Sequence, residues 1–352
     1  MKWYNPAMPP FKISGFPYFE EDGIYRRLPL NPKRELPEAV YYLADETAGG
    51  QIRFRGKFKK LTMRVSLASK PLFFNTKSPH LAMTAKYGFD LYFAKDGGEY
   101  EFFGVTKGYT GAELYYESTL VEAEEPIEVE ALINFPLYGA VDKVLIGFDS
   151  EAEIFPTERE FADGKKILFY GGSIEQGACA SRPGMSESNI LSRWLCREVY
   201  NLGFNSSGKA EAPVAEVIRE IRNIGAFVIS TEGNCPSGDY LYENLGKFIE
   251  IFREVHPRVP IILMPFVESG AERLIFKKGE DRRAKREAQI RLVRERRDQG
   301  DENIHLYLRD SEPELFDSHP VTPDRVVDGL HQTDYGYLET AKGLYKLLKN
   351  LL

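Results

Sequence analysis

The sequence predicts a two-part protein in which an antiparallel β-sandwich precedes a doubly wound α/β sheet. The chain has 352 residues, which suffices for two domains at roughly 100–200 residues each. Between residues 40 and 150, strand-like segments follow one another with little helical periodicity. After residue 160, strand-like and helix-like segments alternate. The predicted domains are therefore residues 1–155 and 160–352.

The first part is expected to consist of half-buried strands. Segment 60–69 carries apolar side chains at positions 61, 63, 65 and 67, the two-residue period of a strand with one buried face. Segment 88–105 has apolar and aromatic runs on both sides of Asp96-Gly97-Gly98, which is the pattern of a β-hairpin. Nearby aromatic side chains are expected in the core rather than on a sugar-binding surface: Tyr87, Phe89, Tyr92 and Phe93.

The second part alternates at the spacing of parallel βαβ units, which form a doubly wound sheet. Sheets of this kind place their chemistry at the carboxyl ends of the strands. The predicted strands are 165–170, 199–204, 226–231, 259–266 and 303–309. The predicted helices are 186–199, 212–223, 241–256, 281–299 and 335–352.

Composition and charge exclude several classes of protein. Hydrophobic residues make up 43% of the chain and the formal net charge is −7, so neither disorder nor binding to nucleic acid is expected. The basic stretch 277–297 contains interleaved acids and is interpreted as the solvated face of a helix. The longest apolar run, 259–267, is too short to span a membrane, and the N-terminus lacks a signal-peptide pattern. A cytoplasmic location without membrane association is therefore expected.

Motifs of several other enzyme classes are missing. The α/β-hydrolase elbow G-x-S-x-G fails because Glu175 stands at its last position, and no dinucleotide fingerprint, Walker A loop or HExxH motif occurs. The three cysteines are too few for a disulfide framework and lack the CxxC spacing of a zinc site. No metal and no organic cofactor are expected. The cysteines are Cys179, Cys196 and Cys235.

The stretch 165–177, KKILFYGGSIEQG, places Ser173 just after a predicted strand. A serine nucleophile needs a base, a group that orients the base, and donors for an oxyanion. His331 is the candidate base, because Asp328 stands three residues before it and its carboxylate can fix the imidazole tautomer. His319 is a second candidate, but it has no acid at the same offset. Taken alone, Asp-x-x-His is also typical of a surface loop before a helix.

Two further strand ends supply candidate oxyanion donors. Segment 201–209, NLGFNSSGK, follows the second predicted strand, and segment 230–238, STEGNCPSG, follows the third. Backbone N–H groups of the first segment and the side-chain amide of Asn234 would both lie at the sheet edge that carries Ser173. Ordinary βα loops have a similar composition. These segments can therefore supply oxyanion donors only if all the blocks meet at one edge of the sheet.

These blocks together resemble the GDSL/SGNH hydrolase superfamily, whose serine, glycine, asparagine and histidine blocks follow in this order. Segment 88–92, GFDLY, resembles the signature of the β-rich GxDLY domain that precedes one subgroup, and segment 177–193 resembles that subgroup's extension of the serine block. The matches cover most of the chain. The four blocks are Gly171-Gly172-Ser173, NLGFNSS, Gly233-Asn234 and Asp328-Gly-Leu-His331.

The resemblance implies a flavodoxin-like three-layer α/β/α catalytic domain behind a jelly-roll-like β-sandwich. It implies Ser173 as nucleophile, His331 as general base and Asp328 as the group that orients the histidine. The implied oxyanion donors are the N–H of Ser173, a backbone N–H near Ser206, and the side chain of Asn234. The expected activity is that of a serine esterase removing a short acyl group, with acetyl expected, from a small-molecule or carbohydrate ester.

Three positions depart from the pattern of the superfamily. Gly172 replaces the usual aspartate before the serine, and Cys235 replaces the aspartate that usually follows the asparagine. Ser206 replaces the usual glycine of the second block, and a serine at positive φ would be strained. Gly203 and Gly208 are alternative sources of that backbone N–H.

Two alternatives to hydrolysis remain. The altered second and third blocks suggest a weak or inactive hydrolase fold that binds glycans. The same catalytic residues could also transfer the acyl group to another alcohol or thiol. Arg182, which follows the serine block in SRPGM, is expected to form a structural salt bridge rather than to contact a substrate.

Overall fold

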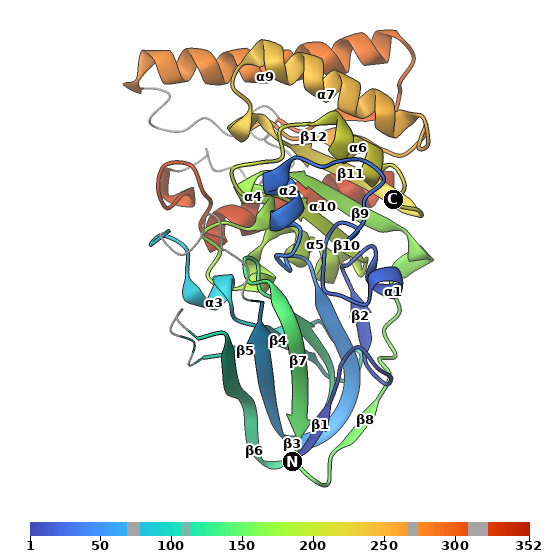
Figure 1. The fold of residues 1–352 in the computed structure, drawn as a ribbon, viewed down its shortest axis with the longest axis vertical. Helices are drawn as coiled ribbons and strands as arrows, with labels where there is room; N and C mark the ends of the chain where they lie inside the picture. The colour runs from blue at the N-terminus through green and yellow to red at the C-terminus, as the bar shows by residue number, and fades with distance from the viewer. Residues whose placement is uncertain (69–77, 108, 110–112, 267–273, 309–322) are drawn as a thin grey trace.

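The computed structural model describes residues 1–68, 78–107, 109, 113–266, 274–308 and 323–352. Figure 1 shows an antiparallel sheet in the lower half of the molecule, with the N-terminus at its far end, and an α/β region in the upper half. The predicted order, antiparallel strands first and a doubly wound sheet second, is confirmed.

Among the described residues, eight antiparallel strands form the sheet of the first region, in the order β1-β7-β3-β6-β4-β5, with β2 and β8 also paired to β3. The long strands β3 and β6 pair along most of their length, with two register shifts. β4 and β5 form the predicted hairpin, whose turn has φ of 49° at Asp96 and 76° at Gly97. The strands are β1 (Lys2–Tyr4), β2 (Lys12–Ser14), β3 (Gln51–Leu67), β4 (Asp90–Ala94), β5 (Glu101–Val105), β6 (Tyr115–Asn134), β7 (Val141–Phe148) and β8 (Glu153–Phe155).

Aromatic side chains dominate the core of this region. Phe54 packs edge-on against Phe148, with ring centroids 5.6 Å apart, and Phe89 contacts Phe135 at 4.9 Å. The period-two segment in β3 buries its apolar side chains as predicted. Of the four aromatics expected in the core, Tyr87, Phe89 and Tyr92 are buried and Phe93 is half-buried.

In the described part of the second region, five parallel strands form a sheet in the order β10-β9-β11-β12-β13. In chain order this is 2-1-3-4-5, the flavodoxin-like arrangement, whose switch point lies at the end of β9. Strands β9, β10, β11 and β12 are buried almost throughout because helices cover both faces, whereas only Ile304 is buried in the edge strand β13. The strands are β9 (Lys166–Gly171), β10 (Val199–Gly203), β11 (Ile224–Ser230), β12 (Ile261–Leu263) and β13 (Ile304–Leu306).

Helices α6 (Ala212–Ile218), α7 (Gly238–Arg253) and α9 (Phe276–Asp298) cover one face of the parallel sheet, and α5 (Glu187–Leu195) and α10 (Asp334–Leu351) cover the other. The structure therefore has the three layers that the family resemblance implies. Helix α5 ends four residues earlier than predicted, because Cys196 adopts a left-handed φ of 51°.

The N-terminal segment does not stay within the antiparallel region. Figure 1 shows α2 (Glu38–Leu43), in blue, beside the strands of the α/β half. Val40 and Leu43 are buried in the core that covers one face of the parallel sheet. This packing was not predicted, because its apolar residues follow no regular spacing. Three other short helices are α1 (Phe19–Asp22), α3 (Met83–Lys86) and α4 (Ser173–Gln176).

Arg27 fastens this segment to β10, the edge strand of the parallel sheet. Its fully buried guanidinium donates to the carbonyls of Asn201 at 3.2 Å, Gly203, and Leu43 at 2.6 Å. Asn201 and Gly203 are two residues apart, so their carbonyls point to the same, outer side of β10. Burial lowers the pKa of Arg27 to about 10. The arginine thus donates to edge carbonyls that, in the part of the chain that the structure describes, no further strand covers.

The GFDLY motif joins the two regions at another point. Asp90, fully buried, accepts hydrogen bonds from the Gly184 N–H at 2.6 Å and from the Asn134 amide at 2.8 Å. Burial raises the pKa of Asp90 to about 6, although the hydrogen bonds from Asn134 and Gly184 act to lower it. Arg182 lies 3.8 Å from Asp90 and 3.9 Å from Asp334, which confirms its expected structural salt bridge.

Within the described residues, none of the helices combines the length and the apolar character that crossing a membrane requires.

Candidate active site

Ser173 lies at the carboxyl end of β9, where the chain turns abruptly into α4. At Gly171 a β-carbon would come within 2.1 Å of the Ser230 carbonyl oxygen, so only glycine fits between the strands. The carboxylate of Glu175 accepts the Gly172 N–H at 3.0 Å and closes the turn. Ser173 is therefore the first residue of a rigid strand-to-helix turn.

Helix α10 holds the other side of this turn. The hydroxyl of Tyr337, which is fully buried, donates to the carbonyls of Ile174 at 3.0 Å and Ala178 at 2.8 Å. The Ser173 carbonyl accepts the Ala178 N–H at 2.9 Å. Helix α10 thus positions both Ser173, through Tyr337, and His331, which directly precedes the helix.

The structure brings the three residues of the predicted triad together. Ser173 Oγ lies 2.8 Å from His331 Nε2, and His331 Nδ1 lies 2.7 Å from Asp328 Oδ2. The second Asp328 oxygen accepts the His331 backbone N–H at 2.8 Å, which fixes the carboxylate in the turn. Burial opposes ionisation of Asp328, but the hydrogen bonds from His331 lower its pKa to about 2. The carboxylate is therefore charged at neutral pH and keeps the ring proton on Nδ1.

The backbone N–H groups predicted near the oxyanion differ in whether they already donate a hydrogen bond. Within the described parts of the chain, the N–H groups of Ser173, Ser206 and Gly208 donate to no other residue. The Gly203 N–H donates to the Asn201 side chain at 3.0 Å and is not free. Ser206 adopts a φ of 57°, the strained conformation expected for a serine at this position.

Asn234 lies close to the serine turn, in the short helical segment Glu232–Asn234 after β11. Its side-chain Nδ2 donates to the Ser207 carbonyl and would come within 2.4 Å of a β-carbon at position 172. Gly172, which departs from the superfamily pattern, therefore leaves room for the Asn234 amide where it lies here. Cys235, the third departure, is buried in the core and donates to the Thr231 carbonyl at 3.3 Å.

Sequence reasoning missed two residues that shape the site. Gln176 is fully buried and joins three segments: its amide donates to Glu46 and to the Leu137 carbonyl at 3.0 Å, and its oxygen accepts the Asn205 N–H at 2.8 Å. It therefore positions the loop that contains Ser206. The only signal was its place in the same short helix as the serine.

His80 is the second missed residue, because the sequence placed it in the β-rich part. Its ring lies 5.6 Å from that of His331 at an interplanar angle of 24°, and its Nε2 is 4.0 Å from Asp328 Oδ2. The region before α3 thus reaches the site. His319, the second candidate base, lies outside the described residues.

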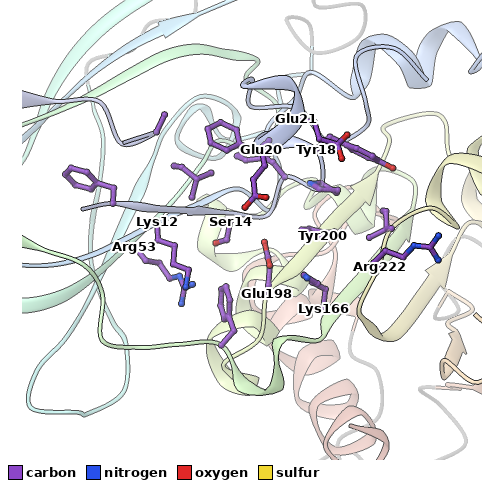
Figure 2. A pocket seen from close by; sticks show the side chains of 18 of the residues that line it. Lys12, Ser14, Tyr18, Glu20, Glu21, Arg53, Lys166, Glu198, Tyr200 and Arg222 are labelled. Carbon is purple, nitrogen blue, oxygen red and sulfur yellow. The ribbon is translucent and has the colours of Figure 1, made fainter. Parts of the chain in front are cut away.

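A cavity of about 620 Å³ lies at the opposite, amino edge of the parallel sheet (Figure 2). Lys166, Glu198 and Arg222 line it from the starts of β9, β10 and β11, and Lys12 lines it from β2. Glu198 accepts the Gly15 N–H at 2.9 Å, and burial raises its pKa. Its lining carries charges of both signs and contains none of the predicted catalytic residues, so this cavity is distinct from the Ser173 site.

The comparison with known families agrees with this geometry. Residues 164–349 match the GDSL-like lipase/acylhydrolase family, and residues 1–154 match the family described as the N-terminus of SGNH-hydrolase-type esterases. The chain belongs to the GDSL-like lipase/acylhydrolase family. It is accordingly a carboxylic ester hydrolase, as predicted.

Solved structures with the same two-region architecture span nearly the whole chain. A protein described as a GDSL-like lipase from Bacteroides ovatus ATCC 8483 is 27% identical, with a TM-score of 0.87, covering 99% of this chain and 97% of that one. A salicylyl-acyltransferase from a tetracycline biosynthetic pathway is 19% identical, with a TM-score of 0.74 and the same coverage. An acetyl xylan esterase from the rumen bacterium Butyrivibrio proteoclasticus is 12% identical, with a TM-score of 0.58, covering 99% and 98%. A search of curated proteins gave no match.

Proposed function

We propose that this protein is a serine esterase that removes a short acyl group, acetyl in the simplest case, from a carbohydrate or other small-molecule ester. The observation that carries the proposal is the continuous hydrogen-bond chain from Ser173 Oγ through His331 to Asp328, with links of 2.8 and 2.7 Å. A charged Asp328 that holds the ring proton on Nδ1 leaves Nε2 as an acceptor for the serine proton.

In the first half of the proposed reaction, Ser173 Oγ attacks the ester carbonyl while its proton passes to His331 Nε2. The carbonyl π electrons move to the oxygen and form a tetrahedral oxyanion. His331 then gives the proton to the leaving alcohol as the C–O bond breaks, which leaves an acyl-serine. In the second half, a water molecule attacks the acyl carbon while its proton passes to His331. His331 then returns the proton to Ser173 Oγ as the bond between Oγ and the acyl carbon breaks, which releases the carboxylic acid and restores Ser173.

The free N–H groups of Ser173 and Ser206 are the proposed backbone donors to the oxyanion, and the Asn234 amide is the proposed side-chain donor. Asn234 Nδ2 donates to the Ser207 carbonyl here, and the same nitrogen carries a second N–H that is the proposed donor to the oxyanion. Donors of this kind act in the transition state, where the negative charge develops.

The carbohydrate part of the proposal rests on likeness of fold. The similar structures include an acetyl xylan esterase and family two carbohydrate esterases, whose identities of 12% support the fold alone.

The first test is hydrolysis of p-nitrophenyl acetate by the wild type, Ser173→Ala and His331→Ala, with peracetylated xylose and xylan acetate as second substrates. Both variants are expected to lose turnover by at least a thousandfold while staying folded. His305→Ala is the matched histidine control, since His305 lies on the edge strand β13. Turnover by Ser173→Ala equal to that of the wild type would show that Ser173 is not the nucleophile. An inert wild type would favour a glycan-binding protein.

Acyl transfer is a second candidate, favoured by the likeness to the salicylyl-acyltransferase. In this reaction an acceptor alcohol takes the place of water in the second half. Product analysis with and without added acceptor alcohols separates the two reactions. An ester product that forms faster than free acid at millimolar acceptor would assign transfer rather than hydrolysis.

A further inference from the structure

Three side chains from separate parts of the chain converge beside the Ser173–His331 hydrogen bond. They are His80, Cys179 and His331, and one ligand atom of each lies within 4.8 Å of the other two. His80 precedes α3, Cys179 follows α4, and His331 precedes α10. Of the three, only His331 has a part in the proposed reaction, so the other two need a separate explanation.

The backbone around Cys179 is fixed. Cys179 has a φ of 67°, and the preceding residue, Ala178, both donates to the Ser173 carbonyl at 2.9 Å and accepts from Tyr337 at 2.8 Å. Burial, together with the negative charge of Asp328, raises the pKa of the Cys179 thiol to about 12. At neutral pH the thiol is protonated, which makes it a poor nucleophile.

His80 is the adjustable member of the group. Its side chain is 34% exposed and stacks beside His331 without a close hydrogen bond to it. Its Nε2 lies 4.0 Å from Asp328 Oδ2, so a carboxylate borders the same space. A rotation of the exposed ring can therefore change the separation of the ligand atoms without moving the fold.

We propose that His80, Cys179 and His331 form a binding site for a thiophilic divalent metal ion, with Zn²⁺ as the reference ion, and that the bound ion inhibits the esterase. Two imidazoles and a thiolate are a ligand set that zinc favours. Zinc ligands lie about 3.5 Å from one another in a tetrahedral site, so side-chain shifts of about 1 Å bring these atoms into range. Asp328 or water would supply the fourth ligand.

Inhibition follows from how His331 is already bonded. Its Nε2 is engaged by Ser173 and its Nδ1 by Asp328. A metal ion on either nitrogen must break one of these two hydrogen bonds. Binding also replaces the thiol proton of Cys179, which is released to solvent, so affinity rises with pH. Metal binding and ester turnover therefore exclude each other, and a chelator restores activity.

The binding test uses the purified full-length chain and the metal ion alone, and it does not depend on the proposed function. Titration with Co²⁺ is expected to produce thiolate-to-cobalt charge-transfer absorption at one ion per chain, and calorimetry with Zn²⁺ the same stoichiometry. Cys179→Ser should abolish the absorption, and His80→Asn should weaken binding at least tenfold. Cys196→Ser is the matched control, because Cys196 is exposed on the turn after α5. Absorption that persists in Cys179→Ser, or is absent from the wild type, would overturn the site.

The inhibition test rests on the proposed function and is read separately. Zn²⁺ is expected to suppress p-nitrophenyl acetate turnover in the wild type, with recovery on addition of EDTA. Each variant is compared with its own metal-free rate, and His80→Asn should need at least tenfold more Zn²⁺. Binding of Zn²⁺ without loss of turnover would show that His331 is not a ligand of the metal ion. An inert wild type that still binds Co²⁺ through Cys179 would refute the esterase proposal and uphold the metal site.

Discussion

Replacement of Arg27 by methionine tests whether the N-terminal segment holds the end of β10, and with it the loop that follows. Methionine keeps an unbranched apolar side chain, shorter than that of arginine, and removes the donors to Asn201, Gly203 and Leu43. Because β10 is the edge strand, no neighbouring strand can replace these donors.

The expected loss of stability follows from two opposing effects. Three buried carbonyls lose charged donors, at about 1.5–3 kcal/mol each, or roughly 6 kcal/mol in total. The variant no longer buries a cation, which removes an unfavourable desolvation free energy. The fall of the Arg27 pKa from 12.5 to about 10 corresponds to about 3 kcal/mol for this effect. The free energy of unfolding should therefore fall by about 3 kcal/mol.

The assay combines urea denaturation with kcat for p-nitrophenyl acetate. Arg26→Met is the matched control, because Arg26 is also buried but bonds to Asp45 and to the Tyr41 carbonyl, and not to β10. Both variants should lose stability. Only Arg27→Met should also lower kcat, by about tenfold, since a small displacement of the Ser206 loop misplaces an oxyanion donor.

An unfolding free energy of Arg27→Met within about 0.5 kcal/mol of the wild type, with an unchanged urea m value, would refute the proposed role of Arg27 at the strand edge. A change of that size is typical of an ordinary surface substitution. Equal kcat values for the two arginine variants would show instead that the edge is stabilised without any effect on the site.

Three further results are expected. Ser206→Gly should raise the free energy of unfolding by about 1 kcal/mol in urea, because glycine adopts the observed φ of 57° without strain, and a lower value would contradict this. Asn234→Ala should lower kcat by about 10²–10³ with little change in KM, and a fall below threefold would remove it as a donor. For Asp90, the folded pKa of about 6 exceeds the ordinary value of 3.8, so the folded state binds the proton more tightly and stability falls as pH rises. The full loss is about 3 kcal/mol, of which about 2 kcal/mol falls between pH 4 and pH 6. Asp90→Asn should lack this loss when the free energies of unfolding at pH 4 and pH 7 are measured in urea. A loss of stability between these pH values as large in the variant as in the wild type would contradict the assignment.

The parts of the fold that depend on local pattern were predictable. Strict alternation of strand and helix after residue 160 fixed a parallel sheet, and a sheet of this kind collects its strand ends at one edge. Ser173 and His331 could be paired for that reason, although 158 residues separate them. The assignment of their chemical roles stays a prediction, as do the domain limits 1–155 and 160–352.

The contacts that a single segment does not encode were missed. Arg27 bonds to a strand 176 residues away, and nothing in its neighbourhood distinguishes it from the exposed arginines of α9. His80 was assigned to the β-rich part, yet its ring lies against His331. In both cases the partner is chosen by how the two regions pack, which residue spacing does not report.

The position of α2 and Arg27 bears on how such a protein can change by recombination. A gene fragment encoding only the α/β half would leave Val40 and Leu43 absent from its core and the outer carbonyls of β10 without a donor. Exchange of the N-terminal half between relatives would succeed only where the incoming half carries a matching arginine and apolar helix. The two halves are therefore expected to be inherited together and to vary in concert, rather than to be shuffled as independent cassettes.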